Sequence, residues 1–156
     1  MTISCLQGGQ AIAQLSKGTK TNLEIQKILY FANMLYIGEN GVEKPLIDNK
    51  FLTWRYGPAV EKLYYAIKER ENKHVPLRVF DDIKRIMNED ESPVSGYEEQ
   101  VEIIKKAYKQ FSKYSPFELV RISHWSKGAW RRSKNRGLKE IDNGLILDEF
   151  NARSRQ

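Results

Sequence analysis

The long apolar segment between residues 22 and 38 restricts the possible folds of this chain more than any other feature. Its apolar residues recur every three or four positions, which predicts a helix with a buried stripe. The stripe consists of Ile25, Ile28, Leu29, Ala32, Leu35 and Tyr36, and it is widened by Leu23, Phe31 and Met34. A helix that is apolar on most of its surface needs neighbours on several sides, so we expect it at the centre of the domain.

The polar positions of this helix form one narrow line. Gln26, Tyr30 and Asn33 follow one another at helical spacing, and Lys27 lies beside them. Two interpretations remain open. One is a partly buried polar seam that hydrogen-bonds to neighbouring elements, and the other is a contact surface or small groove for a partner.

Two capping boxes mark where helices begin. Thr21 and Glu24 stand three residues apart before the long helix, and Ser115 and Glu118 have the same spacing before a shorter one. In this pattern each side chain bonds to the other residue's backbone amide, which satisfies two donors at the helix start.

The remaining patterns predict a mainly α chain. A clear apolar stripe indicates a helix over 97–111, whereas only a small β element is expected around residues 50–56. We therefore expect a compact single-domain helical bundle over residues 1–150, with a frayed C-terminal tail over 151–156.

The N-terminus carries little predicted structure. A short helix is expected over 10–16, and Gly8 and Gly9 disfavour its extension towards Met1. Cys5, the single cysteine, is expected in this mobile segment, where a thiol nucleophile would lack a nearby base. The lone cysteine and the absence of a signal-peptide pattern favour a cytoplasmic protein.

The motifs of common enzyme classes are missing. No glycine pattern matches a phosphate-binding loop, and His74 and His124 have no metal-ligand partner at a suitable spacing. We therefore expect that the protein is not an enzyme and that it has no catalytic residue, metal ion or cofactor. The enzyme alternative is an unrecognised hydrolase or transferase with a pocket near Tyr30, Arg55 and His124.

The positive charge of the chain is concentrated in one segment. The net charge is +6, and residues 121–139 contain seven basic residues and no acidic one. They are Arg121, Lys127, Arg131, Arg132, Lys134, Arg136 and Lys139. One interpretation is a solvated helix face, and the other is a binding surface for nucleic acid, an acidic protein or a phosphate.

The segment Trp54-Arg55-Tyr56-Gly57-Pro58 is unusual for a loop because it is bulky and charged. Gly57 and Pro58 suit a sharp turn from an extended strand into a helix. Trp54 is a candidate core residue. Arg55 and Tyr56 have no structural role in this interpretation, so we expect them to contact a partner.

Three stretches of the chain resemble one family, the phage-associated Panacea domain, also called the SocA-like antitoxin domain. Residues 21–32 are similar to its first motif, and residues 54–58 to its second. Leu119, Ile122-Ser123-His124 and Ala129-Trp130 resemble its third motif. The order and spacing also match, over about residues 10–150.

The resemblance implies an antitoxin that neutralises a cognate toxin, encoded nearby, by direct protein–protein binding. One type of member acts as a proteolytic adaptor, so a AAA+ protease is a second expected partner. No membrane partner is expected, and the sequence predicts no oligomeric state. The alternative function is a nucleic-acid-binding regulatory protein that uses residues 121–139 and whose binding weakens steeply with salt.

The expected binding surface combines aromatic and arginine anchors with a charged rim. The residues assigned to it are Gln26, Lys27, Tyr30, Asn33, Trp54, Arg55, Tyr56, His124, Trp130, Arg131 and Arg132. For His124, packing against Trp130 or capping a helix end is the structural interpretation, and a pH-sensitive role is the functional one.

Overall fold

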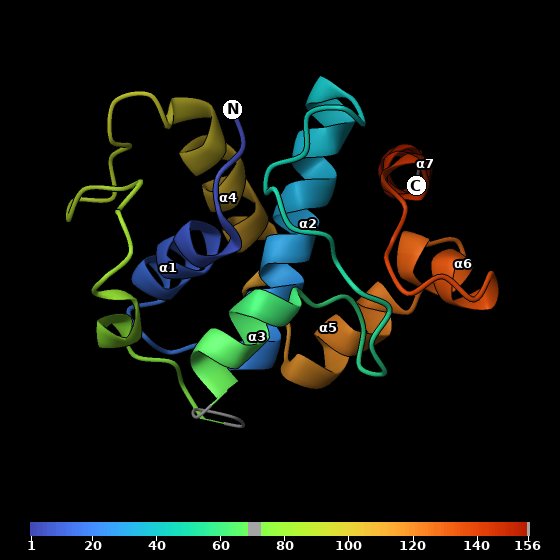
Figure 1. The fold of residues 1–156 in the computed structure, drawn as a ribbon, viewed down its shortest axis with the longest axis horizontal. Helices are drawn as coiled ribbons and strands as arrows, with labels where there is room; N and C mark the ends of the chain where they lie inside the picture. Colours follow the sequence, from blue (N-terminus) through green and yellow to red (C-terminus); the bar gives the residue numbers. More distant parts are fainter. Residues whose placement is uncertain (69–72, 156) are drawn as a thin grey trace.

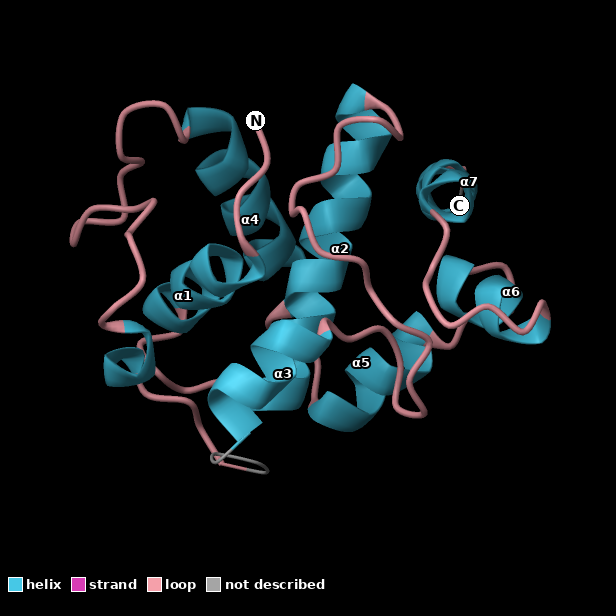
Figure 2. Ribbon diagram, viewed as in Figure 1, coloured by secondary structure: helices cyan, strands magenta, loops and turns pink. Residues whose placement is uncertain are grey.

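The regular structure of this protein is helical (Figure 2). The computed structural model describes residues 1–68 and 73–155. The helices are α1 (Cys5–Leu15), α2 (Asn22–Asn40), α3 (Glu61–Ile67), the 3-10 helix η2 (Leu77–Phe80), α4 (Glu98–Phe111), α5 (Pro116–Ser123), α6 (Ala129–Asn135) and α7 (Asn143–Ser154). The predicted mainly α bundle is confirmed. None of the described helices combines the length and apolar character needed to cross a membrane.

Helix α2 is the centre of the fold (Figure 1). It contacts α1, α3, α4, α5 and α7. Figure 1 shows α1 and α4 on one side of it and α5, α6 and α7 on the other. Every residue from Glu24 to Ile37 is buried, so neighbours surround the whole circumference, as the broad apolar surface predicted.

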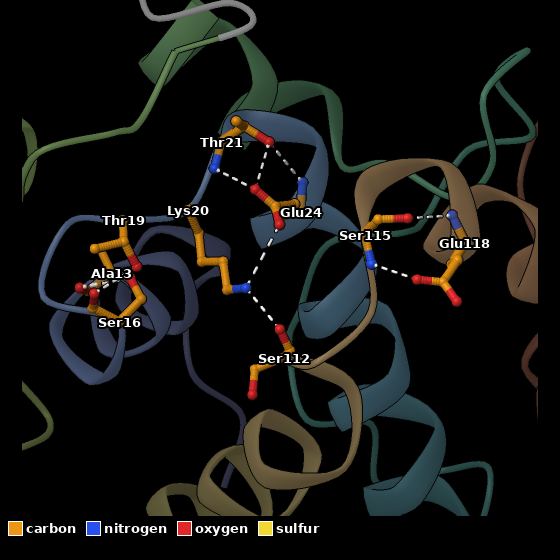
Figure 3. A network of polar contacts seen from close by, with 9 residues as sticks. All are labelled: Ala13, Ser16, Thr19, Lys20, Thr21, Glu24, Ser112, Ser115 and Glu118. Atoms are coloured by element: carbon orange, nitrogen blue, oxygen red, sulfur yellow. Dashed lines mark hydrogen bonds and ion pairs between the residues drawn. The ribbon is translucent and has the colours of Figure 1, made fainter.

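Both predicted capping boxes are confirmed (Figure 3). The Thr21 hydroxyl accepts a hydrogen bond from the Glu24 amide, and the Glu24 carboxylate accepts one from the Thr21 amide at 3.0 Å. Ser115 and Glu118 make the same pair of bonds at the start of α5. These local bonds set where α2 and α5 begin.

A lysine connects the start of α2 to the end of α4 (Figure 3). Lys20 Nζ donates to the backbone oxygen of Ser112 at 2.7 Å and lies 3.5 Å from Glu24 Oε2. The capping carboxylate therefore also takes part in packing between helices.

The N-terminal prediction is wrong, because α1 begins at Cys5 with a capping box at Ser4. A Cβ at Gly8 would lie 2.6 Å from a methyl carbon of Leu29, and a Cβ at Gly9 would lie 2.9 Å from a methyl carbon of Leu63. The glycines allow α1 to approach its neighbours, and this packing outweighs their low helix propensity. Cys5 is consequently buried rather than mobile.

The β element expected over residues 50–56 is reduced to isolated bridges. Leu52 forms antiparallel bridges with Ala59 and with Glu140, and the described residues contain no longer strand. The helix predicted to start at Pro58 begins at Glu61 instead.

The tail predicted to fray from residue 151 is helical as far as Ser154. Arg153 donates to Glu149 Oε2 at 2.8 Å and to the backbone oxygen of Ile122 at 2.9 Å. These bonds dock the end of α7 on α5, which explains why the short polar segment stays helical. Gln156 lies outside the described residues.

Candidate functional site

The polar line of α2 lies inside the fold. The side-chain amide of Gln26 exchanges two hydrogen bonds with the backbone of Val60, at 2.8 and 3.2 Å. Asn33 Oδ1 accepts from the Leu46 amide at 2.9 Å. Both side chains are 2% exposed, so they form a buried seam that satisfies backbone groups of the following loop. The alternative, that this line presents a contact surface, is wrong for this structure.

Lys27 belongs to the same buried line and has an unusual environment for a cation. Its Nζ donates to the backbone oxygen of Pro58 at 2.9 Å, and no described carboxylate forms an ion pair with it. Burial lowers the pKa of Lys27 from 10.5 to about 7, because desolvation penalises the charged ammonium. The hydrogen bond of Lys27 therefore fixes the turn at Pro58, whereas the burial of its ammonium group lowers the stability of the folded protein.

Tyr30 is bonded to a glutamate that the sequence interpretation missed. Tyr30 donates to Glu149 Oε1 at 2.6 Å, and the same oxygen accepts from the Ala129 amide at 2.9 Å. Arg153 occupies the other carboxylate oxygen. Glu149 is 1% exposed. It stands three residues after Ile146, on the apolar face of α7. A charged residue at that position was the available signal.

The third motif forms an aromatic stack. The rings of His124 and Trp130 lie 3.9 Å apart and nearly parallel, and Trp130 Nε1 donates to the backbone oxygen of Trp54 at 2.9 Å. The structural interpretation of His124, packing against Trp130, is confirmed. Desolvation lowers the pKa of His124, and the nearby charges of Arg131, Lys27 and Lys134 lower it further. Its buried Nε2 has no hydrogen-bond partner among the described residues.

Gly57 is the point where the three motifs meet. Its φ of +107° lies in the region that favours glycine. A Cβ at this position would lie 2.5 Å from Ser123 Oγ and 2.8 Å from Lys27 Cε. The second motif is therefore held between the first motif on α2 and the third on α5.

Two residues of the turn remain exposed. Tyr56 has 59% of its surface accessible, and the guanidinium carbon of Arg55 lies 5.6 Å from the centre of its ring. Arg55 forms no ion pair with any described residue. Trp54 is half-buried and packs edge-on against Tyr64 of α3. The turn thus presents an arginine and a tyrosine from a rigid support.

The basic residues of α6, which include the predicted rim residues Arg131 and Arg132, have different environments. Arg131 and Lys134 both lie over the Trp130 ring, at 5.1 and 5.5 Å from its centre. Arg132 instead pairs with Asp148 at 3.2 Å. Charge on this side of α6 is therefore only partly neutralised.

An open groove with a volume of about 890 Å³ lies beside the turn. It is lined by Lys50, Leu52, Thr53, Trp54, Glu61, Leu138, Lys139, Glu140, Ile141 and Asp142. Of the predicted site residues it includes Trp54, whereas Tyr30, Arg55 and His124 do not line it. The pocket that the enzyme alternative requires therefore does not lie at this groove.

The family described as "Antitoxin SocA-like, Panacea domain" matches residues 25–131. The chain belongs to this family. It is also 30% identical over 112 residues to the protein named Antitoxin SocA from Caulobacter vibrioides (strain NA1000 / CB15N). That similarity covers 70% of this chain and 57% of the relative. No solved structure matches the chain.

The matched part of this Panacea domain includes the contacts around Gly57 but not the carboxylate that bonds to Tyr30. Lys27, Gly57 and Ser123 all lie within residues 25–131, whereas Glu149 lies beyond them. The carboxylate that bonds to Tyr30 is therefore supplied by a helix outside the matched part of the domain.

Proposed function

We propose that this chain neutralises a cognate toxin, encoded nearby, by binding it directly in the cytoplasm rather than by catalysis. Membership of the SocA-like antitoxin family supports an antitoxin role. The observation that supports direct binding is the exposed pair Arg55 and Tyr56 on a turn fixed from beneath. Arginine and tyrosine are common anchors of protein interfaces, and a pre-organised turn loses little entropy on binding.

The contact region consists of the exposed part of the predicted set. Arg55 and Tyr56 form its centre, with the edge of Trp54 and the rim residues Arg131 and Arg132 beside them. The buried residues of the predicted set do not touch the partner and instead hold the exposed residues in place. Lys27, for example, bonds to the carbonyl oxygen of Pro58 and so fixes the turn.

The nucleic-acid alternative has less support from the geometry. Trp130 is 2% exposed and cannot stack on a base, and Arg132 is already paired with Asp148. Helix α6 spans seven residues, and its residues Ala129 and Trp130 are buried. Little of the helix is therefore left to enter the major groove of DNA.

Co-expression tests the proposal. We expect the neighbouring gene product to arrest growth alone and this chain to restore growth. The double variant Arg55→Ala/Tyr56→Ala should fail to restore it at equal protein level, whereas the exposed control Val42→Ala/Lys44→Ala should succeed. A neighbouring product that is not toxic, or no rescue by the unaltered chain, contradicts the proposal. Rescue that needs an active AAA+ protease would assign the adaptor mode; rescue without it would assign neutralisation by binding alone.

A further inference from the structure

Two cations lie over the Trp130 ring, and a third follows Trp54, the residue to which Trp130 bonds. The backbone oxygen of Trp54 accepts the indole hydrogen bond of Trp130, and Arg55 follows Trp54 directly. Arg131 and Lys134 lie over the Trp130 ring, and Lys134 Nζ also donates to the Thr53 backbone oxygen at 3.2 Å. These bonds hold the backbone next to Arg55 against α6, which carries Arg131 and Lys134.

None of the three cations forms an ion pair with a described carboxylate. The ion pairs of the described residues join Lys20 to Glu24, Lys106 to Glu39, Arg132 to Asp148 and Arg153 to Glu149. Residues 121–139 contain no carboxylate side chain. The downward shift in the pKa of His124, to which Arg131 and Lys134 contribute after burial, indicates a locally positive field.

We propose that Arg55, Arg131 and Lys134, named here the cationic face, bind an acidic segment of the toxin. This inference rests on the proposed function and specifies the chemistry of the partner. Guanidinium groups form paired hydrogen bonds with carboxylates. A cation already positioned over an aromatic ring has less side-chain freedom to lose on binding.

A protein carboxylate fits this face better than a nucleic acid does. Sequence-independent binding of single-stranded nucleic acid combines a basic groove with exposed aromatic rings on which bases stack. Here the Trp130 ring is buried beneath its cations, and the exposed ring of Tyr56 lies beside Arg55. The buried Trp130 ring therefore offers no stacking platform, whereas the cations around it offer donors for carboxylates.

Titration calorimetry with the neighbouring gene product tests this inference. The face variant Arg55→Glu/Arg131→Glu/Lys134→Glu is compared with a control variant, Lys44→Glu/Lys109→Glu/Lys113→Glu, which changes net charge equally. The control includes a cation over a ring, since Lys113 lies 5.4 Å from the centre of Tyr114. We expect the face variant to weaken binding at least about tenfold and to reduce its salt dependence, and the control variant to change affinity less than about twofold.

The single variant Arg55→Glu guards against misfolding, because Arg55 is exposed and lies against the neighbouring ring of Tyr56. It should weaken binding with an unchanged thermal melt. Equal affinity of the unaltered chain and the folded Arg55→Glu and face variants for the toxin overturns the inference and leaves the proposed function intact.

A second arm uses probes that do not depend on the toxin. A fluorescein-labelled oligoglutamate peptide should bind the unaltered chain and the control variant but not the face variant. If the gene product does not bind at all, the proposed function fails, and this arm alone decides the chemistry of the face. Absent peptide binding, or tighter binding of duplex DNA that the face variant abolishes, overturns the acidic-segment assignment.

Discussion

Gly57 lies so close to Ser123 that a Cβ on the glycine would be 2.5 Å from the serine Oγ. This contact joins the turn to α5. The same Cβ would lie 2.8 Å from Cε of Lys27, which belongs to α2. The face that carries Arg55 and Tyr56 is therefore positioned by a glycine that two helices enclose.

Gly57→Ala should lower the free energy of unfolding by about 2–5 kcal/mol, because it adds an overpacked methyl group to an unfavourable backbone angle. Gly41→Ala is the matched control. Gly41 has a similar φ of +98°, but a Cβ there would meet nothing within 4 Å, so only the backbone cost of about 1–3 kcal/mol remains. Urea unfolding followed by circular dichroism measures both, and equal losses would contradict the packing explanation.

Lys27 should make stability depend on pH. Its pKa is about 7 in the folded protein, against 10.5 for an ordinary lysine. The unfolded chain therefore binds more protons between these values, so stability should rise as pH increases from about 7, by about 1.4 kcal/mol per pH unit. Below pH 7 both states are protonated and this contribution is constant.

Lys27→Met should remove that slope, because the variant has no proton to bind at this position. Replacing the exposed Lys44 by Met should leave the slope unchanged. Denaturant unfolding of the three proteins across mildly alkaline pH makes the comparison. A flat profile for the unaltered chain would show that Lys27 keeps its proton when folded.

Tyr30→Phe should destabilise the protein by about 1.5–3 kcal/mol, the range for a lost hydrogen bond to a buried charged group. The variant removes the 2.6 Å bond to Glu149 and leaves a 1% exposed carboxylate with one donor fewer. Tyr97→Phe is the control, since the Tyr97 hydroxyl has no side-chain hydrogen bond among the described contacts. Equal thermal melts for both variants would count against the importance of this bond.

Gly38→Ala should be destabilising although alanine favours helices by about 1 kcal/mol. A Cβ at residue 38 would lie 2.3 Å from the ring of Phe150, so the ring of α7 must move. The double variant Gly38→Ala/Phe150→Ala should lose less stability than the two single losses added together, which a double-mutant cycle measures. Additive losses would show that α7 does not pack here.

The sequence alone determined the local features of the fold. The periodicity of α2 and the capping boxes at Thr21 and Ser115 are relations between residues three or four positions apart, so they can be recognised without knowing the rest of the fold. The family resemblance also came from local motifs. These features were sufficient to predict a mainly α domain with one central helix.

The tertiary structure decided which polar residues are accessible. Gln26, Lys27, Tyr30 and Asn33 lie on the polar line of a helix whose every side is covered, so they bond inward rather than to a partner. Their partners are distant in the chain: Pro58 is 31 residues from Lys27, and Glu149 is 119 from Tyr30.

The physical reason is that burial is a property of packing, not of residue type. The same arginine chemistry gave an exposed Arg55, an ion-paired Arg132 and an Arg153 that docks the last helix. Periodicity identifies a polar line, but only the neighbouring elements determine whether water, a carbonyl group or a partner protein satisfies it.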